Sequence, residues 1–153
     1  MVIPERGFIK DLDSIPFPAR HLLDMSLYLE KQPGPYAMRW PSSTIITSRG
    51  CPNACAYCTI KFVWGSHRWR GRSAGNVVDE IELLYKRYGV REFQVMDDSA
   101  GTNKTRLQEI CREILKRGLD VKWTTPNGIA HWFLDEETLK LMKMAGCYRI
   151  TFG

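Results

Sequence analysis

Three stretches of the chain place apolar residues at helical spacing, and a glycine follows each of them. The apolar positions of 76–88 share one helical face, and Gly89 has the conformational freedom to end that helix. The other two stretches begin beside polar residues whose side chains are suited to cap a helix start. We therefore expect helices over 76–88, from Thr102 or Asn103 to Gly118, and from Asp135 to Gly146.

Short segments rich in β-branched and aromatic residues separate these helices and predict strands. The expected strands are 43–48, 91–96, 121–125 and 148–152. Strands that alternate with helices form βαβ crossovers, so the fold class is α/β with a parallel sheet. The loops 49–75, 97–102 and 126–134 each follow a strand. We expect a functional site there, because loops at the carboxyl ends of parallel strands build the sites of such folds.

The first part of the chain has a different character. Residues 1–42 contain six of the eight prolines, and proline removes backbone donors and restricts φ. This segment is therefore expected to be an irregular, proline-rich connector with one short helix near 19–29. It resembles a connector whose preceding partner is missing. Residues 43–153 form the second predicted unit.

Composition is that of a soluble globular domain, with 153 residues, 44% hydrophobic and 25% charged. Apolar stretches are far shorter than a membrane span requires, and the N-terminus lacks the pattern of a secretory signal. These features predict a cytoplasmic protein without membrane contact. The net charge is +5, and residues 61–72 carry four basic side chains, two tryptophans and no acid. That stretch is either a nucleic-acid footprint or a basic loop beside an anionic cofactor, and the second interpretation is favoured.

Three of the five cysteines lie within eight positions, in the spacing Cys51-x3-Cys55-x2-Cys58. Such closely spaced thiolates suit zinc or an iron–sulfur cluster. A zinc site would require a fourth ligand, for which His67 is the nearby candidate. The remaining cysteines lie on a helix stripe and at a strand start, and are expected to be small core residues: Cys111 and Cys147.

The motif Cys51-x3-Cys55-x-Tyr57-Cys58, placed after a strand, resembles the signature of the radical S-adenosylmethionine (SAM) enzymes. The resemblance covers 43–153 and implies a partial (β/α) TIM-like barrel, truncated here to about four strands. It also implies that the three cysteines bind a 4Fe–4S cluster whose fourth iron coordinates SAM. The reduced cluster would then cleave SAM to a 5′-deoxyadenosyl radical, with an electron from a donor such as flavodoxin or ferredoxin.

Within that superfamily, the chain is most similar to the cobalamin-binding branch, on the residues SRGCPNACAYC, RGRS and MDDS. This implies a methyl transfer or a rearrangement on a small-molecule substrate, with cobalamin in the full-length parent. The chain is then expected to be a fragment of the catalytic barrel. Two alternatives stay open: an RNA-modifying enzyme similar to the methylthiotransferases, and a zinc- or cluster-binding module without turnover.

Three further polar residues after the strands are candidates for binding the cofactor. Asp97 and Asp98 end the second predicted strand, at the place where the family contacts the amino group of SAM. The alternative is a polar turn that caps the next helix. Asn127 follows the third strand and faces either the ribose or the substrate, or belongs only to a Pro-Asn-Gly turn.

Overall fold

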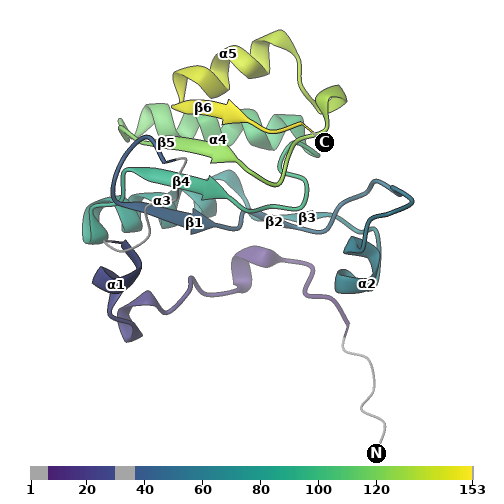
Figure 1. The fold of residues 1–153 in the computed structure, drawn as a ribbon, viewed down its shortest axis with the longest axis horizontal. Helices are drawn as coiled ribbons and strands as arrows, with labels where there is room; N and C mark the ends of the chain where they lie inside the picture. Colours follow the sequence, from purple (N-terminus) through teal and green to yellow (C-terminus); the bar gives the residue numbers. More distant parts are fainter. Residues whose placement is uncertain (1–6, 30–36, 153) are drawn as a thin grey trace, which may run out of the picture.

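A computed structural model describes residues 7–29 and 37–152 of the chain. Its centre is a four-stranded sheet in the order β1-β4-β5-β6, and all neighbouring strands are parallel (Figure 1). The predicted α/β class and the partial-barrel architecture are confirmed in this sheet. The strands are β1 (Ser42–Ile45), β4 (Glu92–Val95), β5 (Lys122–Thr125) and β6 (Cys147–Ile150).

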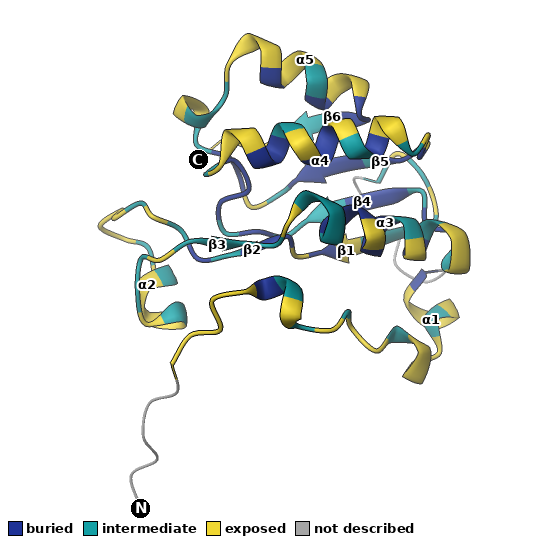
Figure 2. Cartoon of the chain, turned by 180° about the vertical axis from the view of Figure 1, so that it is seen from behind, coloured by how far each residue is buried: buried dark blue, intermediate teal, exposed yellow. Residues whose placement is uncertain are grey.

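The three predicted helices connect successive strands and bury one face each against the sheet (Figure 2). Each helix follows a capping residue whose side chain accepts a hydrogen bond from the backbone N–H three residues later. These capping residues are Ser73, Asn103 and Asp135. Ser73 explains why the first helix starts two residues earlier than its apolar pattern predicts. The helices are α3 (Ala74–Tyr88), α4 (Lys104–Lys116) and α5 (Glu136–Met144).

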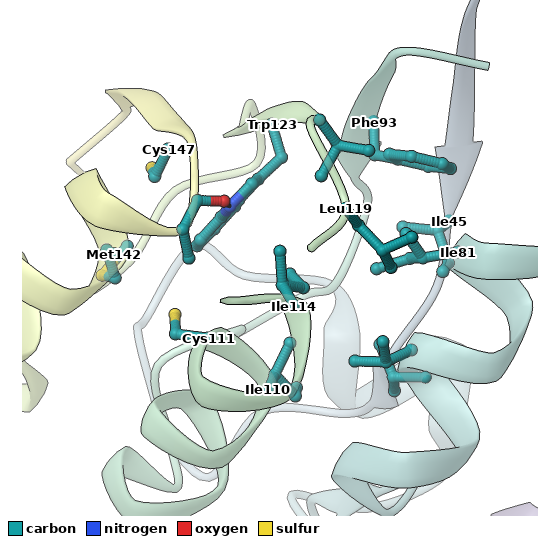
Figure 3. Packing of buried hydrophobic residues seen from close by; sticks show 14 of the residues in the cluster. Ile45, Ile81, Phe93, Ile110, Cys111, Ile114, Leu119, Trp123, Met142 and Cys147 are labelled. Carbon is teal, nitrogen blue, oxygen red and sulfur yellow. Dashed lines mark hydrogen bonds between the residues drawn. The ribbon is translucent and has the colours of Figure 1, made fainter. Parts of the chain in front are cut away.

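The core lies between the sheet and these helices, where side chains from both layers meet (Figure 3). Phe93 and Trp123 enter it from the strands, and the Trp123 indole N–H donates to the Ala145 carbonyl at 3.0 Å. Cys111 and Cys147 are both buried in this cluster. Their predicted role as small core residues is confirmed.

The described part of the connector runs beside β1 and α3 (Figure 1). The prediction of one short helix over 19–29 is corrected to separate pieces, because Asp24 caps a new start by accepting a hydrogen bond from the Ser26 N–H. The pieces are the 3₁₀ turn η2 (Arg20–Leu22) and the helix α1 (Met25–Leu29), and a separate 3₁₀ turn, η1 (Leu12–Ser14), precedes them. Residues 1–6 and 30–36 of the predicted connector lie outside the described residues.

The strand predicted at 43–48 is also divided, and the loop after it is more ordered than its sequence suggests. β1 ends at Ile45, and β2 (Ser48–Arg49) turns away to pair antiparallel with β3 (Arg70–Gly71). Between them, the loop forms the short helix α2 (Ile60–Trp64). No helix among the described residues has the length and hydropathy to cross a membrane.

Candidate functional site

A cavity of about 400 Å³ lies at the carboxyl ends of the strands, among the loops predicted to follow them. The cysteine loop, residues 50–64, supplies one part of its lining, and the loops after β4 and β5 supply the rest. The cavity has the size and the mixed polar and apolar lining of a small-molecule site. The lining residues are Cys51, Asn53, Cys55, Tyr57, Cys58, Ile60, Asp98, Ser99, Asn127, Gly128, Ile129, Ala130 and Trp132.

All three clustered cysteines therefore face one cavity. Cys55 is exposed, Cys51 and Cys58 are half-buried, and none of the three forms a disulfide. The Cys58 N–H donates to the Cys55 carbonyl at 3.1 Å, which bends the loop into a turn between these two thiols. The loop thus presents three free thiols to the same space.

The donor set at the cavity is of the type that an iron–sulfur cluster requires. Within the described ranges, no three His, Cys, Asp or Glu side chains lie close enough together to hold one metal ion. Thiolates of a 4Fe–4S cluster bind different iron atoms, so they are spaced more widely than the ligands of one zinc. His67, the proposed fourth zinc ligand, does not line the cavity with the cysteines. Thiolate is the ligand type that iron–sulfur clusters require, and a 400 Å³ cavity offers space beside it.

Asp97 and Asp98 are neighbours in sequence but have different surroundings. Asp97 is 1% exposed, does not line the cavity, and accepts three hydrogen bonds of 2.5–2.6 Å from Thr47 and Ser48. Its carboxylate ties the end of β4 to the start of the cysteine loop. Asp98 lines the cavity, and its Oδ2 accepts hydrogen bonds from the Gly50 N–H at 2.9 Å and the Trp64 indole at 2.7 Å.

Tyr57 and Asn127 lie on different walls of the cavity. Tyr57 belongs to the cysteine loop and is 87% exposed, so its ring is accessible to a ligand. The Asn127 amide donates to the Met96 carbonyl at 3.0 Å, which joins the loops after β4 and β5. The Gly128 N–H donates to the Thr125 carbonyl and closes the predicted Pro-Asn-Gly turn. Asn127 therefore belongs to this turn and also lines the cavity.

Trp132 is a cavity residue that the sequence analysis does not single out. It lies in the 3₁₀ turn η3 (His131–Phe133) after β5, lines the cavity and remains 60% exposed. The available signal is positional: an aromatic residue follows the carboxyl end of a predicted parallel strand. An exposed tryptophan there adds a second aromatic wall to the one that Tyr57 provides.

Two arginines of the basic and aromatic stretch 61–72 contact other parts of the chain. Arg70 donates to the Ile9 carbonyl at 2.6 Å, and Arg72 forms a 2.5 Å ion pair with Glu80. These two guanidinium groups thus have partners within the chain, one in the connector and one in α3. The nucleic-acid footprint itself stays a prediction.

Thiol labelling of the metal-free chain is expected to divide the five cysteines into two groups. Burial raises the pKa of Cys111 and Cys147 to about 12, and the thiolate is the nucleophile that alkylating reagents need. At pH 8, iodoacetamide should therefore modify the accessible Cys51, Cys55 and Cys58 while sparing the other two. Peptide mass spectrometry measures this, with the denatured chain as the control in which all five react. Fast modification of Cys111 in the folded chain would contradict the buried position.

Comparison with known proteins places this arrangement in context. The family model described as the radical SAM superfamily matches residues 45–153. A cytidylyl-2-hydroxyethylphosphonate methyltransferase of Streptomyces wedmorensis is 40% identical over 152 residues, which cover 98% of this chain and 28% of that protein. An uncharacterized methyltransferase of Pyrococcus horikoshii is 36% identical over 150 residues, which cover 98% of this chain and 30% of that protein. The chain thus spans less than a third of either relative.

A solved structure has a similar fold. It is that of the radical SAM methyltransferase TsrM from Kitasatospora setae with cobalamin and a [4Fe–4S] cluster bound. The TM-score is 0.61 at 24% identity, and the match covers 69% of this chain and 19% of that one. At this identity the likeness concerns the fold, and it agrees with the partial barrel described above.

Proposed function

The chain belongs to the radical SAM superfamily, and from that membership we propose that it binds a 4Fe–4S cluster through Cys51, Cys55 and Cys58, with SAM beside it. One observation carries the proposal. The structure places three free thiols on one cavity, while both other cysteines are buried in the core. Among the described residues, three cysteines line this cavity, and these are the ligands that we propose for the cluster. A cluster with three cysteines keeps one iron open for a small-molecule chelator.

Held there and reduced, a 4Fe–4S cluster would supply the electron for reductive cleavage of SAM. The residues of this chain would bind and orient the reactants. Tyr57 presents an accessible ring that can pack on the adenine, and Asp98 presents a carboxylate that can accept from the SAM amino group. Asn127 provides an amide at the opposite loop, suited to a ribose hydroxyl or the substrate. Asp97 acts one layer below, holding the start of the cysteine loop in place.

We propose a methyl transfer on a small molecule as the reaction of the full-length parent. Both relatives quoted above are named methyltransferases, and the fold neighbour is a methyltransferase with cobalamin bound. Cobalamin is accordingly proposed for the parent protein, outside the cavity described here. An electron donor such as flavodoxin or ferredoxin completes the scheme. Free thiols and a reducible cluster suit the reducing cytoplasm, which we propose as the location.

Anaerobic reconstitution tests the proposal directly. The chain is expected to take up iron and sulfide, and the reduced protein should give an electron paramagnetic resonance (EPR) signal that changes when SAM is added. A changed signal requires SAM to lie at the cluster, so it tests the open iron and not only the presence of iron. One zinc per chain without sulfide, or a cluster signal indifferent to SAM, would refute the proposal.

A further inference from the structure

Two tryptophans of the stretch 61–72 donate hydrogen bonds to consecutive residues after β4. The Trp64 indole N–H donates to the Asp98 carboxylate at 2.7 Å, and the Trp69 indole N–H donates to the Ser99 carbonyl at 3.2 Å. Both tryptophans are half-buried. The stretch therefore fastens the cysteine loop to the loop after β4, a role distinct from the nucleic-acid footprint considered above.

The two contacts differ in chemistry. Trp64 donates to an anionic group, and hydrogen bonds with one ionised partner are shorter and stronger than those between neutral groups. An indole can only donate, so this contact holds the carboxylate in one orientation. Both donors, the Trp64 indole and the Gly50 N–H, bind the same oxygen, Oδ2. Among the described residues, no donor engages Oδ1 of Asp98, although this side chain lines the cavity.

The two donors to Asp98, Gly50 and Trp64, lie at opposite ends of the cysteine loop. Gly50 immediately precedes Cys51, and Trp64 is the last residue of α2, which follows Cys58. Both ends of the cysteine loop are therefore fixed on one carboxylate oxygen. The Arg49 guanidinium lies 5.8 Å from the centre of the Trp64 ring, so it adds a cation–π contact between the same two ends.

Gly50 and Trp64 form the neck of the cysteine loop, and the backbone packs so closely at Gly50 that no side chain fits there. The φ of Gly50 is +84°, and an added Cβ would lie 2.3 Å from the Arg68 carbonyl oxygen. The backbone of Arg68, two residues before β3, thus packs directly against it. Because Gly50 cannot be replaced without a clash, the contact at the neck that can be tested by substitution is the one from the Trp64 indole to Asp98.

We propose that Trp64 is a positioning residue for the cofactor site: it orients the Asp98 carboxylate and closes the neck of the cysteine loop. The inference rests on the proposed function, because the ligand that Asp98 meets is taken to be SAM. Trp64 acts through Asp98, and its effect on ligand binding should therefore vanish when Asp98 is absent.

The matched variants are Trp64→Phe and Trp69→Phe, each of which removes one indole N–H and keeps an aromatic ring. In the reconstituted full chain, W64F is expected to take up as much iron as wild type but to bind SAM about tenfold more weakly, the scale of one hydrogen bond to a charged group. W69F should stay within about threefold, since its neutral contact does not hold the carboxylate. The SAM-induced change of the EPR signal, titrated with SAM, measures both.

A double-mutant cycle separates positioning from general loosening. On an Asp98→Ala background, W64F should cause no further loss of SAM affinity. An equal loss on both backgrounds, or a loss from W69F as large as that from W64F, would overturn the proposal. Should W64F fail to fold, the Asp98→Asn variant replaces it, because asparagine keeps the shape and acceptor but lacks the charge. Unchanged SAM affinity in D98N would equally refute the role of the carboxylate.

Hydrogen exchange in the cluster-free chain distinguishes failure of this inference from failure of the proposed function. The Gly50 amide should exchange faster in W64F than in wild type, because the acceptor Oδ2 is then held by one donor instead of two. Unchanged exchange at Gly50 would overturn the closure of the neck whatever the cofactor. If wild type itself takes up no cluster, the proposed function and the effect on SAM fail, while the amide measurement still tests the neck.

Discussion

Replacing Cys55 by alanine is expected to reduce the iron and sulfide content of the reconstituted chain to background. Cys55 is the exposed, central cysteine of the three that line the cavity. With it removed, two thiolates remain for a cluster that ordinarily takes four cysteines, and no other free thiol is close by to compensate. Quantitative iron and sulfide analysis after desalting measures the loss, together with the EPR signal of the reduced protein.

Cys111→Ala is the matched control, since it removes the same atom from another part of the molecule. That thiol is 0% exposed and packed in the core, so the variant should keep its cluster while losing some stability. Thermal unfolding of both metal-free variants completes the comparison, and Cys55→Ala should unfold like the wild type. Retention of a full cluster in Cys55→Ala, or its loss in Cys111→Ala, would show that the cavity is not the cluster site.

The strands of the sheet and the helices between them can be predicted from the sequence, because they depend on local patterns. Each helix has its own cap and its own apolar stripe, so its existence depends on neighbours within a few positions. Asp135 is an instance: its side chain accepts from the Thr138 N–H at 2.9 Å, three residues along the same chain. The parallel sheet follows because such helices alternate with strands.

The fold of residues 46–73, which include the cysteine loop, depends on contacts between segments distant in sequence, and for this reason the sequence does not reveal it. The β2–β3 pair joins Ser48 to Gly71 and Arg49 to Arg70, and two-residue strands carry no periodic signal. The partners of the two arginines at 70 and 72 are likewise not apparent from the local sequence. Ile9 and Glu80 are those partners for Arg70 and Arg72.

The candidate site shows the same division. The spacing of the three cysteines predicts that they share one site, and the structure places them on one cavity. The phase of the chain at the end of β4 decides which of the two aspartates faces it, and a short strand does not reveal that phase. Asp98 lines the cavity, whereas Asp97 is buried beneath it among Thr47 and Ser48.

Replacing Glu80 by alanine is expected to lower the free energy of unfolding by about 3–5 kcal/mol, the usual cost of removing one partner of a buried ion pair. The Glu80 side chain is 2% exposed and binds two guanidinium groups, Arg20 at 2.6 Å and Arg72 at 2.5 Å. Without this carboxylate, the largely buried guanidinium groups of Arg20 and Arg72 would lie near each other with no compensating charge from Glu80. Chemical denaturation measures the change.

The exposed ion pair Glu136–Lys140, at 2.6 Å, provides the control, because its glutamate side chain is 83% exposed. Glu136→Ala should cost no more than about 1 kcal/mol, as surface pairs do. The connector supplies a second measurement: Arg20 lies in it, so Glu80→Ala should accelerate tryptic cleavage after Arg20, whereas Glu136→Ala should not. Equal stability losses in the two variants, with unchanged cleavage at Arg20, would mean that the buried carboxylate does not hold the connector against the barrel. The connector would then dock through its apolar contacts, with Leu12 and Phe17 as the side chains to test next.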